Sequence, residues 1–355
     1  MILQDSIDVG LLGFALVYTM SLSGLLQWTV RQSAEAEAQF VSVERIEGYS
    51  NLEPEPGYSV TSAERVRTRS LSSLFDPVKP LTSVNDSKKE KSADNKPVGQ
   101  LTLHNVHIKY RQDLEHVIKG LSCDISAGSK IGLVGRTGSG KSTMIQSLLR
   151  LNLITDGDIY LDGESILSMT LENARSQITV IPQEPHLFSG TVRFNLDPFN
   201  IYNDQEIWNA LKNAHIADAL SKELGLLTIV DEGGKNFSVG QRQLLSMARA
   251  ILRKSKVVLM DEVTSSIDYS TDKLLQETIR TCPELRSATI LTIAHRLRTI
   301  ADSDFILVLG PGGQLLEKGK PYDLLTSENS HFKSLAMESQ EFDDLISISS
   351  QSRIE

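Results

Sequence analysis

The stretch "KIGLVGRTGSGKST", Lys130 to Thr143, decides the fold class. A short apolar strand runs into a glycine-rich loop that fits the pattern G-x-x-x-x-G-K-[ST], which binds phosphates. Its glycines let backbone N–H groups curl around a β-phosphate, while Lys141 reaches the β- and γ-phosphates and the Ser142 hydroxyl can bind Mg²⁺. An apolar helix follows at once, as this kind of site requires. The sequence therefore predicts an α/β phosphate-loop domain that binds ATP and Mg²⁺, with contacts from Gly135, Arg136, Thr137, Gly138, Ser139, Gly140, Lys141, Ser142 and Thr143.

Hydrolysis of ATP needs a Mg²⁺-anchoring acid and a group that activates water, and "VVLMDE" offers both. Four apolar residues predict a buried strand, and Asp261 at its end can hold Mg²⁺ through water. Glu262 follows as the natural general base. Adjacent acids after a strand could also begin a helix, but the phosphate loop on a neighbouring strand favours catalysis.

Two further polar residues follow apolar strands. "ITVIPQEP" presents Gln183, which can bind Mg²⁺ or hold the attacking water, and "LTIAHRL" presents His295, which can contact the γ-phosphate. The stretch "KNFSVGQRQLLSMARAILRK" begins like an anion-binding helix at Ser238. Because the chain already has a complete phosphate loop, this helix is expected to face a second phosphate.

The net charge of the chain bears on its partners. The charge is -9, whereas nucleic-acid binders usually carry a basic face, so nucleic acid is not expected as the main partner. Cys123 and Cys282 are too few for a disulfide framework or a metal cluster, so we expect two buried thiols.

The N-terminal stretch from Val9 to Val30 contains no charged residue. At about 1.5 Å per residue, a helix over this stretch is roughly 33 Å long, enough to cross a membrane. A signal peptide fits poorly because the start "MILQDSID" is acidic. The alternative is a buried soluble helix, since Thr19, Ser21, Ser23 and Gln27 dilute the stretch. One span cannot line a pathway, so other spans are expected from elsewhere.

The rest of the chain divides by composition. An Ala- and Glu-rich helix should continue beyond the membrane. A basic, Ser-rich linker follows, in which Arg67 and Arg69 precede Ser72 in a pattern that basophilic kinases accept. From Gln100 alternating apolar residues begin a globular domain, and "DFILVLGPGGQLLEKG" predicts a hairpin. We expect four regions: residues 1–50 as membrane helix and extension, 51–99 as flexible linker, 100–337 as ATPase domain and 338–355 as disordered tail.

The motifs resemble a known family. Gly135–Ser142, Gln183, "FSVGQ", "VVLMDE", "SSID" and "AHR" look like the Walker A, Q-loop, signature, Walker B, D-loop and H-loop segments of an ABC-transporter ATPase domain. Longer phrases such as "EGGKNFSVGQRQLLSMARAILRK" resemble the second nucleotide-binding domain of subfamily C, the multidrug-resistance-associated proteins. "GLLQWTVRQSAEAEAQFVSVERI" is similar to their last membrane helix. The resemblance implies a phosphate-loop NTPase of ABC type, with a mixed sheet core, an antiparallel β subdomain and a helical signature subdomain, preceded by one transmembrane helix.

The resemblance also implies roles. Glu262, His295 and Gln183 would be catalytic, and Ser142, Gln183 and Asp261 would bind the metal. Tyr110, which ends the first strand, matches the aromatic residue that stacks on adenine. In the family two such domains pair head to tail, so that Ser238, Gly240 and Gln241 would cap the ATP held by a partner's phosphate loop.

Val239 departs from the family pattern, because most signature segments have Gly there. Val adopts a positive φ with difficulty, and its side chain occupies space near the partner's nucleotide. Subfamily C second domains commonly have this Val, in the weaker of two composite sites. We therefore expect the ATP on Lys141 to be hydrolysed and the ATP under Ser238 to be held longer. The stretch "LSKELGLLTIVDEGG" also departs from the usual spacing, which leaves the geometry of that loop open.

The function that the resemblance implies is an ATPase that drives export of organic anions or drug conjugates, with its ATPase domain on the cytoplasmic side of a plasma or organelle membrane. An ATP-gated channel or a regulatory subunit of the same subfamily is an alternative, as is a truncated product without transport activity of its own. A soluble ABC ATPase acting on chromosomes or ribosomes would lack a span and carry a basic face, and neither describes this chain.

Overall fold

The computed structural model describes residues 9–52, 55, 98–221, 224–261, 269–294, 296–339 and 341–351. The chain divides into two units, Met1–Tyr58 and Ser59–Glu355. The expected linker, including Ser72, lies almost wholly outside the described residues.

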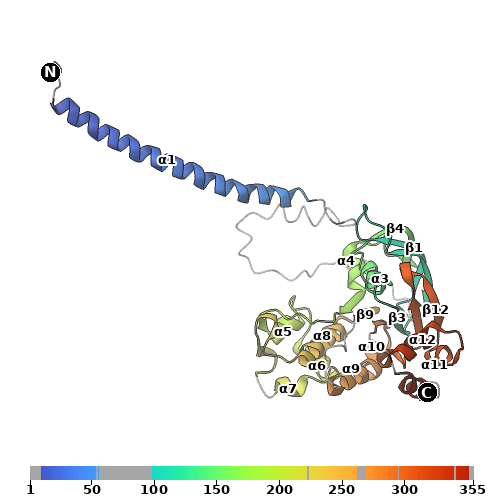
Figure 1. Ribbon diagram of the computed structural model, residues 1–355. Helices are drawn as coiled ribbons and strands as arrows, with labels where there is room; N and C mark the ends of the chain where they lie inside the picture. Colours follow the sequence, from blue (N-terminus) through green and yellow to red (C-terminus); the bar gives the residue numbers. More distant parts are fainter. Residues whose placement is uncertain are drawn as a thin grey trace. The chain divides into compact units, whose positions relative to one another are not determined.

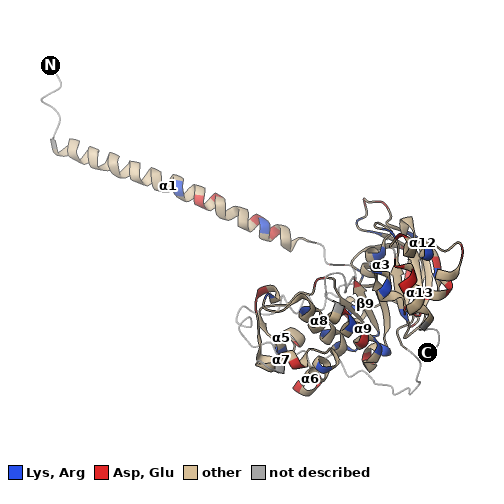
Figure 2. Ribbon diagram, turned by 60° about the horizontal axis from the view of Figure 1, so that its bottom comes forward, with Lys and Arg blue, Asp and Glu red and all other residues tan. Residues whose placement is uncertain are grey.

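The described residues of the first unit form the helix α1 (Val9–Ser50) and a short turn after it, and the first charged residue of α1 is Arg31 (Figures 1 and 2). By length and composition α1 can cross a membrane. The hydroxyls of Thr19 and Ser21 donate to the carbonyl oxygens four residues earlier, at 2.7 and 2.9 Å. These polar groups are therefore satisfied inside the helix, which makes them compatible with a lipid environment.

The second unit contains a mixed sheet of six strands in the order β12-β11-β3-β10-β9-β6. Neighbouring strands from β11 to β6 are parallel, and β12 pairs antiparallel with β11 as the expected hairpin. Continuous apolar runs such as "VVLM" suit strands that are buried on both faces. Its strands are β3 (Lys130–Val134), β6 (Ile178–Ile181), β9 (Val257–Asp261), β10 (Thr289–Ile293), β11 (Phe305–Leu309) and β12 (Leu315–Gly319).

A second, antiparallel sheet has the order β2-β1-β4-β5. Alternating apolar residues of β1 face a shared core, as the pattern "LTLHNVHIK" predicts. Its strands are β1 (Leu101–Lys109), β2 (Ile118–Ile125), β4 (Leu153–Leu161) and β5 (Glu164–Ser165). A short pair, β7 (Gly190–Thr191) and β8 (Ile229–Val230), lies apart from both sheets.

The helices cover the six-stranded sheet and build a separate helical lobe, which we define as α5, α6, α7 and α8 (Figure 1). The apolar core of the lobe includes residues of β6, β9 and β10, whereas α3 shares a second core with the two sheets. The helices are α3 (Lys141–Leu148), α4 (Leu171–Ser176), α5 (Val192–Leu196), α6 (Asp204–Asn213), α7 (Ala217–Ser221), α8 (Val239–Arg253), α9 (Tyr269–Thr281), α10 (Pro283–Arg286), α11 (Pro321–Thr326), α12 (His331–Glu338) and α13 (Phe342–Gln351). Single 3-10 turns are η2 (Gly225–Leu227), η3 (Glu232–Gly234), η4 (Leu297–Ile300) and η5 (Pro311–Gly313). This arrangement of two sheets and a helical lobe confirms the expected fold class.

The prediction of a disordered tail over residues 338–355 is wrong for residues 342–351, which form α13. Leu345 is 0% exposed and joins a cluster with Phe332 of α12. Serine content suggested disorder, but Phe342, Leu345 and Ile346 recur at helical spacing and pack as one apolar stripe. Both cysteines are free and buried, as expected.

Candidate functional site

The phosphate loop connects β3 to α3. Gly135 passes so close to β11 that a Cβ there would collide with the carbonyl oxygen of Leu309. Gly138 has a φ of 83°, which favours glycine, and open space lies where its Cβ would be. The Nζ of Lys141 donates to the carbonyl oxygens of Gly135 at 2.7 Å and Arg136 at 3.2 Å. The loop thus leaves room for a ligand in front of Gly138 and keeps the lysine ammonium close to its first residues.

Tyr110 lies beside the start of α3. Its hydroxyl is 2.7 Å from the Oγ1 of Thr143, and Thr143 is buried. The ring remains 51% exposed, so one part of it is available for stacking while its hydroxyl is tied to the phosphate-loop helix. Ser142, one residue earlier, is exposed and can present its hydroxyl to a metal ion.

The register of the six-stranded sheet brings the remaining predicted residues to one edge. Leu133 of β3 pairs with Ile293 of β10, and Ile293 pairs with Asp261 of β9. The phosphate loop and Asp261 therefore leave the sheet at nearly the same level, on either side of the end of β10.

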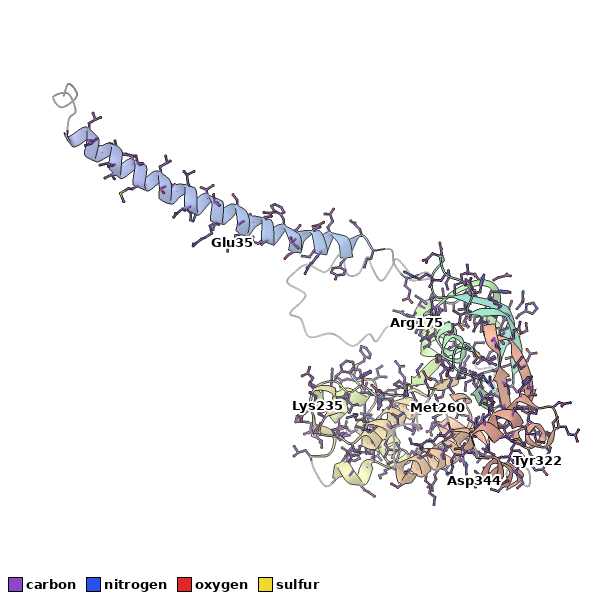
Figure 3. The ribbon with its side chains drawn as sticks, viewed as in Figure 1. Glu35, Arg175, Lys235, Met260, Tyr322 and Asp344 are labelled. Atoms are coloured by element: carbon purple, nitrogen blue, oxygen red, sulfur yellow. The ribbon has the colours of Figure 1, made fainter. Side chains whose placement is uncertain are left out.

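The same edge continues into β6. Ile181 pairs with Met260, an interior residue of the sheet (Figure 3), so the segment that carries Gln183 emerges beside Asp261. Carboxyl ends of parallel strands form the usual ligand site of such sheets. Glu262 and His295 lie outside the described residues, directly after Asp261 and shortly after the end of β10.

The signature residues begin α8. Ser238 is its N-cap: the Ser238 Oγ accepts from the N–H of Gln241 at 3.1 Å, and the Gln241 Oε1 accepts from the N–H of Ser238 at 2.9 Å. These two side chains thus satisfy each other locally. Val239 is the first helical residue and is not among the described residues with positive φ, so its backbone is unstrained and the difference from Gly lies in its side chain. Its side chain is 39% exposed at the helix start.

Gly240 has a packing role as well. A Cβ at this position would lie 2.8 Å from the Oγ1 of Thr271 in α9. The absence of a side chain therefore lets α8 approach α9 closely, in addition to any contact with a phosphate.

Sequence reasoning missed a polar network on α8. The Arg249 guanidinium donates to the carbonyl oxygens of His186 at 2.9 Å and Asn195 at 2.7 Å. Burial, followed by the nearby charge of Arg253, lowers the pKa of Arg249 below its usual range, although an arginine stays charged at neutral pH. A polar residue on the apolar face of an amphipathic helix is the signal that could have revealed this network.

The network supports one wall of a groove of about 840 Å³ in the helical lobe. The groove lies next to the Gln183 segment, since Pro182 lines it. Its rim carries exposed apolar side chains, namely Phe188, Phe194, Phe199 and Ile201.

A smaller cavity of about 440 Å³ borders the outer side of the phosphate loop. Its opposite wall includes α12, and an ion pair joins Arg136 to Glu338 at 2.8 Å. Both side chains of this pair are largely exposed, so its energetic contribution is small.

Comparisons with known proteins agree with this site. The ABC transporter family matches residues 118–265. The chain is 41% identical to ATP-binding cassette sub-family C member 2 of Rattus norvegicus over 93% of its own length and 20% of that protein. It is 41% identical to ABC transporter C family member 8 of Dictyostelium discoideum, over 95% of this chain and 19% of that protein. It is 39% identical to a pleiotropic ABC efflux transporter of multiple drugs from Candida glabrata, over 99% of this chain and 21% of that protein.

The chain thus spans about a fifth of the length of these relatives. The phosphate loop, the sheet edge and the capped α8 of the structure occur in the part that these relatives share with it. Residues 118–265 match the ABC transporter domain, and most of the chain is similar to the ATP-binding part of subfamily C relatives.

Proposed function

We propose that this chain binds and hydrolyses ATP and thereby drives an exporter of organic anions or drug conjugates. The observation that carries the proposal is the alignment of the phosphate loop, Asp261 and the Gln183 segment at one edge of the six-stranded sheet. An exposed hydroxyl at Ser142, with a carboxylate and an amide on the neighbouring segments, is a donor set that suits Mg²⁺.

In this mechanism Lys141 and the backbone N–H groups of the loop hold the β- and γ-phosphates. Mg²⁺ supplies positive charge between these phosphates when it is bound. Gln183 orients a water molecule toward the γ-phosphorus, and Glu262 accepts the proton of that water as the bond to the β–γ bridging oxygen breaks. His295 contacts the γ-phosphate from the end of β10. The roles of Glu262 and His295 rest on their place in the sequence.

A second ATP-binding domain would supply the nucleotide that Ser238 faces. Ser238 is exposed at the N-terminus of a 15-residue helix, where backbone N–H groups and the helix dipole favour a phosphate from outside the domain. Its hydroxyl can accept the bond from Gln241 and still donate one to such a phosphate. The exposed side chain of Val239 would crowd this contact, which supports slow hydrolysis at the site under Ser238.

The attachment to a membrane rests on α1 and the groove. Beyond Arg31, α1 keeps exposed apolar side chains at Phe40, Val43, Ile46 and Tyr49, which can contact other helices. The apolar rim of the groove would receive a segment of the same membrane bundle. ATP-driven closure of the paired domains would then move the bundle, and hydrolysis would reset it.

The name of the Candida glabrata relative, a pleiotropic efflux transporter of multiple drugs, supports an exporter over an ATP-gated channel. A channel or a regulatory subunit remains the second candidate, as does a product without transport activity of its own. ATP turnover that rises with added organic anions in sealed vesicles favours the exporter, whereas ATP-dependent current with constant turnover favours the channel.

The proposal is tested on the chain purified from membranes together with its partner domain. Lys141→Ala should weaken MgATP binding, and Glu262→Gln should keep binding but stall turnover with the paired domains closed. Lys212→Ala, at the end of α6, is a matched lysine control that should change neither. Wild-type MgATP affinity of Lys141→Ala, or wild-type turnover of Glu262→Gln, would refute the assigned roles.

A further inference from the structure

We propose that Gln243 is a positioning residue that holds the Gln183 segment on the signature helix, so that the two move as one body. This inference rests on the proposed function, because it concerns how Gln183 reaches the attacking water. The amide of Gln243 does not touch substrate and acts through the backbone of Pro182.

Gln243 lies on the second turn of α8 and is 1% exposed. Its Nε2 donates to the carbonyl oxygen of Pro182 at 3.2 Å. Pro182 directly follows β6, whose last residue pairs with Met260 beside Asp261. The bond therefore connects the helix that begins at Ser238 with the peptide that precedes Gln183.

A second connection holds the far end of the same segment. Arg249, two turns further along α8, donates to the carbonyl oxygen of His186 at 2.9 Å and to Asn195. Asn195 in turn bonds both the N–H and the carbonyl oxygen of Phe188, each at 2.8 Å. Residues 182–188 are thus fixed to α8 at both ends, and Gln183 lies between the two attachments.

The amide of Gln243 is not fully satisfied, since its Oε1 is buried without a hydrogen-bond partner in the part of the chain that the structure describes. A buried acceptor without a partner is unfavourable for folding. An apolar side chain of similar shape would avoid that cost at a position whose neighbours Leu244 and Met247 are buried and apolar. The amide therefore contributes little stability, and what it provides is a fixed position for the Pro182 carbonyl.

This arrangement links the two halves of the proposed reaction. Ser238 would follow the partner's nucleotide, and a continuous helix carries that motion to Gln243 and Arg249. Both residues are hydrogen-bonded to the Gln183 segment. Closure of Ser238 on the partner's ATP would therefore bring Gln183 toward the water that attacks the ATP bound by this chain. Packed, hydrogen-bonded elements of this kind transmit displacements between sites.

The test compares Gln243→Met with Met247→Leu, a matched change on the buried face of the same helix. Gln243→Met removes the donor but keeps length and burial, so Tm should stay within about 4 °C. We expect kcat for ATP hydrolysis to fall about tenfold, because residues that hold a metal ligand in place typically contribute about that much to activity. KM for ATP should stay within twofold. Amide hydrogen exchange of residues 183–188 should become faster, whereas exchange within α8 should not change. Met247→Leu should leave kcat and exchange at wild-type values.

Wild-type kcat together with wild-type exchange in Gln243→Met would overturn the inference. A parallel fall in kcat, KM and Tm would also overturn it, because a purely structural role predicts that pattern. Lys141→Ala separates the two proposals: if it keeps full MgATP affinity the proposed function fails, and the exchange measurement still decides whether Gln243 holds the segment.

Discussion

Removal of the Tyr110 ring should weaken ATP binding through the base and not through the phosphates. The ring is half-exposed beside the start of α3, and its hydroxyl is 2.7 Å from the Oγ1 of Thr143. Stacking of a base on an aromatic ring contributes about 1–3 kcal/mol by alanine substitution. Tyr110→Ala should therefore lower the affinity for MgATP roughly 5- to 150-fold.

Tyr110→Phe separates stacking from the hydrogen bond, because it keeps the ring and removes only the hydroxyl. A single neutral hydrogen bond contributes about 1 kcal/mol, so the affinity should fall no more than roughly fivefold.

The assay is equilibrium binding to the full chain in lipid nanodiscs, with MgATP and with magnesium tripolyphosphate, which has no base. Tyr110→Ala should reduce affinity for ATP only. An equal loss for both ligands would refute stacking and would mean that Tyr110 acts through Thr143 on the phosphate loop. An unchanged ATP affinity in Tyr110→Ala would refute any role of the ring.

Two further predictions concern stability. Burial would raise the pKa of Asp162, but hydrogen bonds from Lys256 and two backbone N–H groups lower it overall. The ionised Asp162 carboxylate therefore stabilises the fold above its unfolded pKa of about 4. This stabilisation is lost as the pH falls through the lower folded pKa. Asp162→Asn should cost about 1–3 kcal/mol of unfolding free energy at pH 7, and in chemical denaturation its difference from the wild type should shrink toward pH 3; a difference independent of pH would contradict the assignment. Leu345→Ala should cost about 2–5 kcal/mol because α13 is part of the core, whereas the exposed Ser347→Ala should change stability by no more than about 0.5 kcal/mol; equal thermal unfolding of the two variants would show that α13 does not stabilise the domain.

The sequence alone predicted the features that depend on short segments of the chain. Glycines around Lys141 and an apolar strand before them specify a phosphate loop, because backbone geometry and one ammonium suffice for that site. The uncharged stretch before Arg31 specifies a helix that can span a membrane, because its length and composition alone meet that requirement. The order of Gln183, Asp261 and Glu262 after apolar strands indicated an ATPase, since ends of parallel strands converge.

Tertiary structure decided the features that depend on which segments become neighbours. Strand register sets Asp261 level with the end of β3, and no sequence spacing encodes that pairing. Ser composition suggested a disordered tail, yet α13 folds because its apolar stripe finds a surface on α12. The partner of Gln243 could not be predicted from the sequence, because it is the carbonyl of Pro182, a residue distant in sequence. Local geometry and composition are properties of short segments, whereas register, burial and long-range hydrogen bonds exist only once the whole chain has packed.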